Sequence, residues 1–401
     1  MGTCMNARDA QVPVYPTGAH FWRLPRRRTK WQQWYPFSAP AGTWTFSGRV
    51  ALYHGLPSLG LPDGSTILVP TYHQGVEIET LLTAGYRVRY YRLTERLLID
   101  LAHARRQLDH TVSALYVIHY FGFPQPLDDI RAFCEAHRLR LIEDCALALF
   151  SRAHGTWLGS VGDLALFSVY KTAPLPHGGF LLTKQARPPV SLPPAPLAST
   201  LVQSLDLFHN GLQASPWGRV EQWLTRVSRW IRRALRWDRT QTISSGGALW
   251  DPRLLAYGAS AWATGLMRFI DPAEIVVRRR RNFMRLVAHL QGHLPLPWTE
   301  LPSGVCPLFL PVMVPDKPRF QRDLERRGVQ SVNLWDVAHP SCPADLAAEV
   351  AGWRRHCLEL PIHQELSPED IDRIADAVLA VLRIAPAEGS PALAASGRGS
   401  A

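Results

Sequence analysis

The chain has 401 residues and a mass of 45.0 kDa, with 46% apolar and 19% charged residues, which is typical of a globular protein with a large and a smaller domain. It has no apolar run long enough to span a membrane and no N-terminal secretory segment, so we expect a cytoplasmic protein. Six cysteines form no C-x-x-C pair, so we expect no metal site. The net charge of +11 favours anionic partners, but no recognised nucleic-acid-binding module accompanies it, and we expect no nucleic-acid role.

An irregular arm precedes a repeating pattern of strands and helices. Residues 1–40 contain Pro, Trp and a basic cluster and are interpreted as the arm. Apolar segments of strand length then alternate with segments of helix length, which predicts a mainly parallel sheet covered on both faces. The predicted helices lie at 47–61, 75–85 and 126–140, and the predicted strands at 66–70, 86–93, 113–123, 139–144 and 164–170.

This pattern stops after Lys184. Residues 186–247 form an insertion that begins with a Pro-rich segment and includes an amphipathic helix at 217–237. Trp and other apolar residues lie on one face of this helix, and most of its arginines lie on the other. Two interpretations stay open, a packing helix with solvated arginines and a helix that lies on an anionic membrane surface.

The rest of the chain completes two predicted domains. A helix pair after the insertion ends a large domain over 41–300. A strand, a helix, a second strand and a final helix then predict a small α/β domain at 301–385. Residues 386–401 are rich in Ala, Gly, Ser and Pro, which predicts a disordered tail.

Two charged positions in the large domain point to a chemistry. Glu143 and Asp144 end one apolar strand, and Lys171, one of only four lysines, follows the next strand in a loop. A carboxylate and a lysine at the carboxyl ends of buried strands are the charges that a pyridoxal phosphate enzyme needs. The carboxylate keeps the pyridine nitrogen protonated, and the lysine holds the aldehyde as a Schiff base and moves protons. The alternatives are an Asp that caps a strand and a surface lysine.

A set of segments, taken in order, resembles one family. They are SGRVAL (47–52), LVPTYHQGVEI (68–78), VIHYFG (117–122), LIEDCA (141–146), LGSVGDLALFS (158–168), YKTAPLPHGG (170–179), RRRRN (278–282) and LPIHQELS (360–367). Across residues 40–385 the chain is similar to the DegT-type sugar aminotransferases, the pyridoxal phosphate enzymes of nucleotide-sugar and polysaccharide biosynthesis. The resemblance implies an α/β, aspartate-aminotransferase-like fold (fold type I) and a homodimer with active sites at its interface.

The resemblance assigns residues to the cofactor. Asp144 matches the aspartate that pairs with the pyridinium nitrogen, and Lys171 matches the Schiff-base lysine. Ser168 matches a serine that contacts the cofactor phosphate. His73 matches the position whose ring stacks on the cofactor, with a structural histidine as the alternative.

Three further positions, Gly48, Arg49 and Val50, match the phosphate-binding helix N-terminus, where free N–H groups suit an anion. A plain capped helix is the alternative for this segment. His119 is expected to order the loop beyond its strand. Asn210 is a candidate for the phosphate contact that the family takes from the partner subunit.

Two positions depart from the family pattern. Leu147 stands where the family has His or Gln, which bonds the phenolic oxygen of the cofactor. His177 stands where the family has an acid before the paired glycines. We expect both changes to affect the surroundings of the Schiff base, either by shifting its pKa, by changing the substrate, or as a sign of lost catalysis.

The family thus implies a function for the whole chain. We expect an aminotransferase that transfers an amino group, from glutamate, to a nucleotide-linked keto-sugar. The first alternative is a catalytically degenerate homologue with a regulatory role. The second is a scaffold that binds the membrane periphery through 217–237.

Overall fold

The computed structural model describes residues 11–18, 29–40, 42–184, 191–213 and 252–384. Its central element is a seven-stranded sheet with the order β1-β9-β8-β5-β4-β2-β3. The strands are β1 (Thr43–Thr45), β2 (Thr66–Pro70), β3 (Arg87–Tyr91), β4 (Val112–Ile118), β5 (Arg140–Asp144), β8 (Leu164–Ser168) and β9 (Gly179–Thr183). Strands β3, β2, β4, β5 and β8 are parallel, and β9 and β1 add antiparallel pairs at one edge. The sheet is therefore mainly parallel, as the sequence predicts.

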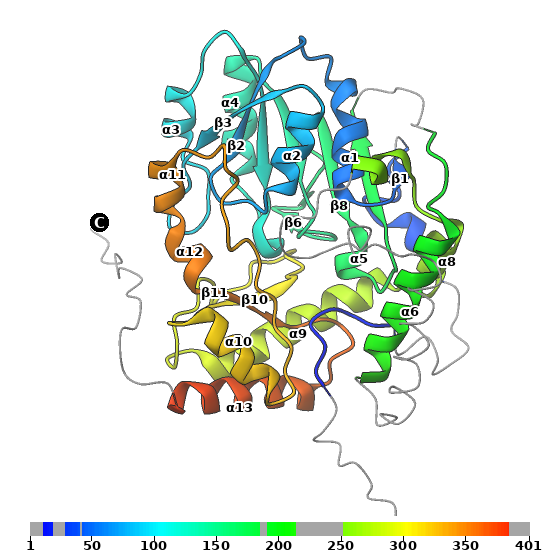
Figure 1. Ribbon diagram of the computed structural model, residues 1–401, viewed down its shortest axis with the longest axis vertical. Helices are drawn as coiled ribbons and strands as arrows, with labels where there is room; N and C mark the ends of the chain where they lie inside the picture. The colour runs from blue at the N-terminus through cyan, green and yellow to red at the C-terminus, as the bar shows by residue number, and fades with distance from the viewer. Residues whose placement is uncertain (1–10, 19–28, 41, 185–190, 214–251, 385–401) are drawn as a thin grey trace, which may run out of the picture.

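Helices cover both faces of this sheet (Figure 1). They include α1 (Gly48–Gly55), α2 (Val76–Thr83), α3 (Leu101–Arg106) and α4 (Leu127–His137). Successive strand residues point to opposite faces, so Ile67 and Val69 pack in the cluster that includes α1 and α2. Leu68, between them, packs with α3 and α4 instead. This alternation explains why the strands are apolar throughout and not at every second residue.

The predicted boundaries fail at two places. The strand predicted over 113–123 ends at Ile118, because Tyr120–Gly122 form a 3-10 turn in which Phe121 has a φ of 56°. The strand predicted over 164–170 ends at Ser168, and Lys171 does not lie in an open loop, because Val169–Thr172 form a one-turn helix, α5, directly after β8. The short β6 (Arg152–Ala153) and β7 (Thr156–Trp157) form a hairpin that the sequence pattern did not predict.

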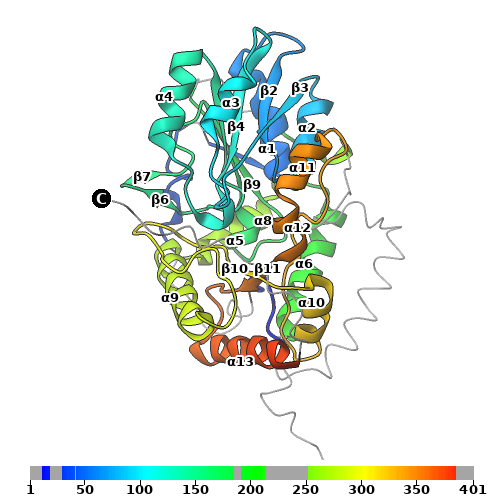
Figure 2. The same cartoon turned by 90° about the vertical axis from the view of Figure 1, so that its left-hand side faces the viewer.

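The C-terminal part contains a two-stranded antiparallel sheet of β10 (Phe309–Met313) and β11 (Cys357–Pro361). Its helices are α9 (Pro272–Leu290), α10 (Lys317–Glu325), α11 (Ala344–Glu349), α12 (Ala351–His356) and α13 (Pro368–Ile384). In both views α12 lies between the large sheet and the β10–β11 pair (Figures 1 and 2). Helix α13 packs against α9 and α10.

The segment between the two parts is described only in part. Helix α6 (Leu197–Gln213) and helix α8 (Ala261–Leu266) flank it. The predicted amphipathic helix at 217–237 and the predicted tail lie outside the described residues. Within the described ranges, none of the helices combines the length and the apolar character needed to cross a bilayer.

Candidate active site

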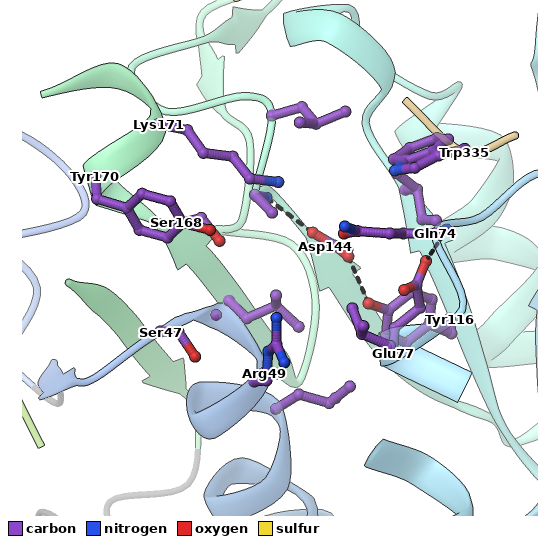
Figure 3. Close-up of a pocket in the computed structure, with 17 residues that line it drawn as sticks. Ser47, Arg49, Gln74, Glu77, Tyr116, Asp144, Ser168, Tyr170, Lys171 and Trp335 are labelled. Atoms are coloured by element: carbon purple, nitrogen blue, oxygen red, sulfur yellow. Dashed lines mark hydrogen bonds between the residues drawn. The ribbon is translucent and has the colours of Figure 1, made fainter. Parts of the chain in front are cut away.

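The topology brings the predicted carboxylate and lysine together. Strands β5 and β8 are parallel neighbours, with Asp144 opposite Leu166 in the register. Asp144 is the last residue of β5, and Lys171 lies in α5 just beyond the end of β8. Because the carboxyl ends of parallel strands meet at one edge of the sheet, both side chains enter the same pocket (Figure 3).

Polar side chains from both parts of the chain line this pocket. They are Ser47, Arg49, Gln74, Glu77, Tyr116, Asp144, Ser168, Tyr170, Lys171 and Trp335. Apolar walls come from residues that include Leu52, Ile118 and Leu147. A pocket with apolar walls and a few convergent polar groups is the usual form of a small-molecule site.

Asp144 is held by two donors before any ligand arrives. The Tyr116 hydroxyl donates to its Oδ2 at 2.5 Å, and the Ala146 N–H donates to its Oδ1 at 2.8 Å. Burial raises the pKa of this carboxyl, although the two hydrogen bonds and the nearby Lys171 oppose the shift. Each carboxylate oxygen has further lone pairs, so Asp144 can also accept from a cationic ring N–H.

Lys171 is buried in a site that favours its neutral form. Burial lowers the pKa of its amine, while the carboxylates of Asp144 and Glu77 oppose this shift. The carbonyl of Thr172 accepts from Arg279 at 3.3 Å and from Gln364 at 3.0 Å. These two hydrogen bonds fix helix α5 to the C-terminal part. A buried lysine with a lowered pKa is a common nucleophile in enzymes.

The first turn of α1 and the end of β8 form a cradle for an anion. Ser47 and Ser168 both line the pocket and are buried. The Ser47 hydroxyl has no hydrogen-bond partner among the described residues, and it does not cap α1. A Cβ at Gly48 would lie 2.6 Å from the Ser168 Oγ, so the backbone approaches this serine as closely as only Gly allows. With Arg49 alongside, these groups match an anion at a helix N-terminus.

Val50 has a different place from its two neighbours. Its side chain is fully buried in a cluster with Phe46, Leu254 and Leu255, away from the pocket. Its backbone N–H, in the first turn of α1, points toward the helix N-terminus together with the N–H groups of Gly48 and Arg49.

The structure does not bring His73 to the pocket. Its ring is fully buried 5.7 Å from the Tyr90 ring, and it is not among the lining residues. Burial holds the pKa of His73 well below its usual range. The loop turns at this point, so the next residue, Gln74, faces the cavity instead. We therefore withdraw His73 as the stacking residue.

The two departures from the family pattern lie at different depths. Leu147 lines the pocket, as its position predicts. His177 does not line it, because its ring stacks on Phe46 at 4.8 Å and its Nε2 accepts from the Ser260 N–H at 3.1 Å. Burial lowers the pKa of His177 to about 4, so the ring is neutral. His177 therefore does not contact the pocket, and any effect of this residue on the Schiff base would be indirect.

The first acid of the pair, Glu143, has a structural role beneath the pocket. Its carboxylate accepts from the His119 ring at 3.0 Å and from the N–H groups of Gly159, Val161 and Gly162. Burial alone would raise the pKa of Glu143, but these donors lower it. His119 also accepts from the Gln125 N–H at 3.1 Å, so it orders the following loop as predicted.

Several lining residues were not found from the sequence. Glu77 is in the first turn of α2, and Tyr116 is in the middle of an apolar strand, where an acid and a tyrosine have many ordinary roles. Trp335 comes from the C-terminal part, and no spacing signal connects it to β5. Asn210 lies in a separate hollow, which shares Tyr170 with the pocket.

Comparison with known proteins shows which family the chain resembles. Residues 39–187 match the DegT/DnrJ/EryC1/StrS aminotransferase family. Over these residues the chain is similar to this family. GDP-perosamine synthase of Vibrio cholerae is 28% identical over 140 residues, which are 34% of this chain and 38% of that protein. The chain thus matches under two fifths of the length of the first such relatives.

A longer match extends over most of the chain. The dTDP-4-dehydro-2,3,6-trideoxy-D-glucose 4-aminotransferase of Saccharopolyspora spinosa is 26% identical over 343 residues, which are 82% of this chain and 81% of that protein. Among solved structures, NtdA from Bacillus subtilis with bound cofactor PMP matches this chain with a TM-score of 0.55 at 17% identity. The match covers 85% of this chain and 73% of the NtdA chain. The fold is thus that of the fold type I aminotransferases.

Proposed function

We propose that this protein is a pyridoxal phosphate-dependent aminotransferase. The observation that carries the proposal is the shared pocket of Asp144 and Lys171, which follow adjacent parallel strands. The family of residues 39–187 and the PMP-bound structural neighbour support the same cofactor.

The residues present fit this cofactor. Ser47, Gly48, Arg49 and Ser168 form the anion cradle that a phosphate requires, with an unpartnered buried hydroxyl at Ser47. When bound, the cofactor supplies a ring that accepts the electrons left behind when a carbon loses its proton.

The chain itself would supply the acid, the base and the exclusion of water that the reaction needs. Asp144, already oriented by Tyr116 and Ala146, would hold a proton on the ring nitrogen of the cofactor. The Lys171 Nζ would hold the cofactor, and as a free amine it would take a proton from the α-carbon of the amino donor. Burial lowers the pKa of this amine, which favours the neutral form that acts as a base. The apolar walls at Leu52 and Leu147 exclude water from these transfers.

We propose glutamate as the amino donor and a nucleotide-linked keto-sugar as the acceptor. The names of the two relatives, a GDP-perosamine synthase and a dTDP-linked deoxysugar aminotransferase, support the acceptor class. The excess of positive charge favours such an anionic substrate.

We also propose a homodimer in the cytoplasm. Leu197 on α6 and Trp262 on α8 are 86% and 56% exposed, and exposed apolar side chains on neighbouring helices support an interface. Light scattering on the purified protein measures the oligomeric state. Membrane association through 217–237 is a further proposal, tested by flotation with anionic liposomes with and without that segment.

A spectrum tests the proposed function. Addition of pyridoxal phosphate to the protein should give an absorption band above 400 nm, which L-glutamate should convert to the band of the amine form. Lys171→Ala should abolish the band, while Lys184→Ala, at an exposed lysine, should keep it. An unchanged band in Lys171→Ala would refute the assignment of this lysine.

A further inference from the structure

A donor in the pocket has no acceptor. Trp335 lines the cavity and is 6% exposed, and its indole Nε1 has no hydrogen-bond partner among the described residues. In Figure 3 the nitrogen-bearing edge of the ring faces the cavity. A buried indole N–H is normally paired, so an unpaired one that faces a pocket indicates a ligand atom that accepts from it.

The indole ring is held firmly in this direction. The ring packs edge-on against Tyr72 at 4.8 Å and Tyr120 at 5.6 Å, and it lies over Phe121 at 6.5 Å. A side chain enclosed by three aromatic rings has few alternative rotamers.

The backbone of this residue is constrained as well. Trp335 has a φ of 60°, which is uncommon for a residue other than Gly. Its carbonyl accepts from the guanidinium of Arg354 at 2.7 Å, and the same guanidinium bonds the carbonyl of His73 at 3.1 Å. Arg354 therefore fixes the Trp335 loop to the loop that enters the pocket from β2. Unusual backbone geometry maintained by its surroundings is frequent at ligand sites.

The polar groups of pyridoxal phosphate can be matched to the pocket one by one. The ring nitrogen matches Asp144, the aldehyde matches Lys171, and the phosphate matches the cradle at Ser47 and Ser168. The phenolic oxygen, a strong acceptor when ionised, has no partner in this set. The Tyr116 hydroxyl is already used by Asp144, and Leu147 in the wall has no donor.

We infer that the Trp335 indole N–H donates a hydrogen bond to the phenolic oxygen of the cofactor. The inference rests on the proposed function, because it requires pyridoxal phosphate in this pocket. It assigns a cofactor contact to the C-terminal part of the chain, so that part takes part in cofactor binding directly.

The test compares two ligands on three proteins. The ligands are pyridoxal 5′-phosphate and its 3-deoxy analogue, which lacks only the phenolic oxygen. The proteins are the wild type, Trp335→Phe, which removes the N–H and keeps an aromatic ring, and Trp298→Phe as the matched control. Trp298 packs on Phe123 at 4.8 Å and does not line the pocket. Dissociation constants come from equilibrium titration of absorbance or fluorescence.

Trp335→Phe should weaken binding of pyridoxal phosphate by about tenfold or more, as expected for one hydrogen bond to a charged acceptor, and should leave the analogue unaffected. Trp298→Phe should change neither. Equal losses for both ligands, or no loss for either, would overturn the inference. A wild type that binds neither ligand would instead remove the proposed function.

A second measurement needs no variant. With nitrogen-15 tryptophan in the whole protein, one of the fourteen indole N–H signals should move downfield with pyridoxal phosphate and not with the analogue. The absence of a signal specific to the phenolic oxygen would also overturn the inference, whether or not Trp335→Phe folds.

Discussion

Replacement of Arg354 tests whether one buried side chain joins the two parts of the molecule. This arginine, on α12, is 6% exposed. Its guanidinium donates to the carbonyls of Thr71 at 2.8 Å, His73 at 3.1 Å, Trp335 at 2.7 Å and Val337 at 3.1 Å. Two of these carbonyls belong to the loop after β2 and two to the loop before α11.

Arg354→Met keeps an unbranched apolar stem and removes all four hydrogen bonds. Each bond to a charged donor contributes about 1.5–3 kcal/mol, and a carbonyl left buried without a donor costs about 1–3 kcal/mol. Burial of the charged guanidinium is itself unfavourable, and it lowers the pKa of Arg354. The variant removes this cost, which offsets part of the loss. These effects partly cancel, and removal of one partner from a buried charged interaction typically costs about 3–5 kcal/mol, so we expect the free energy of unfolding to fall by that amount.

Urea unfolding at pH 7.5 measures this loss, and Arg355→Met is the matched control. Arg355 is exposed, and its one hydrogen bond within the described part of the chain is to the Ala351 carbonyl of its own helix, at 3.4 Å. Its replacement should therefore cost under about 0.5 kcal/mol. A loss below about 1 kcal/mol in Arg354→Met would show that the four contacts do not join the two parts.

Three further changes have definite expected outcomes. Asp144→Asn keeps the shape and removes the charge, so we expect the rate of amine-form production with glutamate to fall by about a hundredfold or more, measured by stopped-flow absorbance; an unchanged rate would contradict the role of this acid. Gly48→Ala places a Cβ 2.6 Å from the Ser168 Oγ, so affinity for pyridoxal phosphate should fall at least about tenfold while free pyridoxal binds as before; equal losses would argue against a phosphate cradle. Burial raises the pKa of Glu359 from 4.5 to about 8. The folded protein therefore holds this proton more tightly than the unfolded chain. The contribution of Glu359 to stability should be fully present below pH 4.5 and be lost as the pH rises to about 8. Glu359→Gln should flatten this part of the curve of unfolding free energy against pH. An unchanged slope would be evidence against a contribution of Glu359 to this pH dependence.

The parts of the fold and site that could be predicted are those coded locally. Strand β2 was predicted with its observed bounds, because its apolar run is flanked by clear turn signals. Asp144 and Lys171 were predicted because each lies at or just beyond the end of a buried strand, and neighbouring parallel strands bring such ends together. Each member of this pair can therefore be recognised from the few residues that surround it.

The missed residues depend on contacts between distant segments. His73 and Gln74 are adjacent, and which of them faces the pocket is decided by how the loop after β2 meets Arg354, some 280 residues later. Trp335 enters the pocket because the C-terminal part packs against the large sheet, and no local period encodes that packing. The hydroxyl of Tyr116 reaches Asp144 only across the β4–β5 pairing.

The register between β5 and β8 has a consequence for how this chain can vary. Asp144 stands opposite Leu166, two residues before the end of β8 and five before Lys171. One residue inserted into either strand would turn every following side chain of that strand to the opposite face. Lengths of loops elsewhere can change without moving the acid relative to the amine, but the interval from Leu166 to Lys171 cannot.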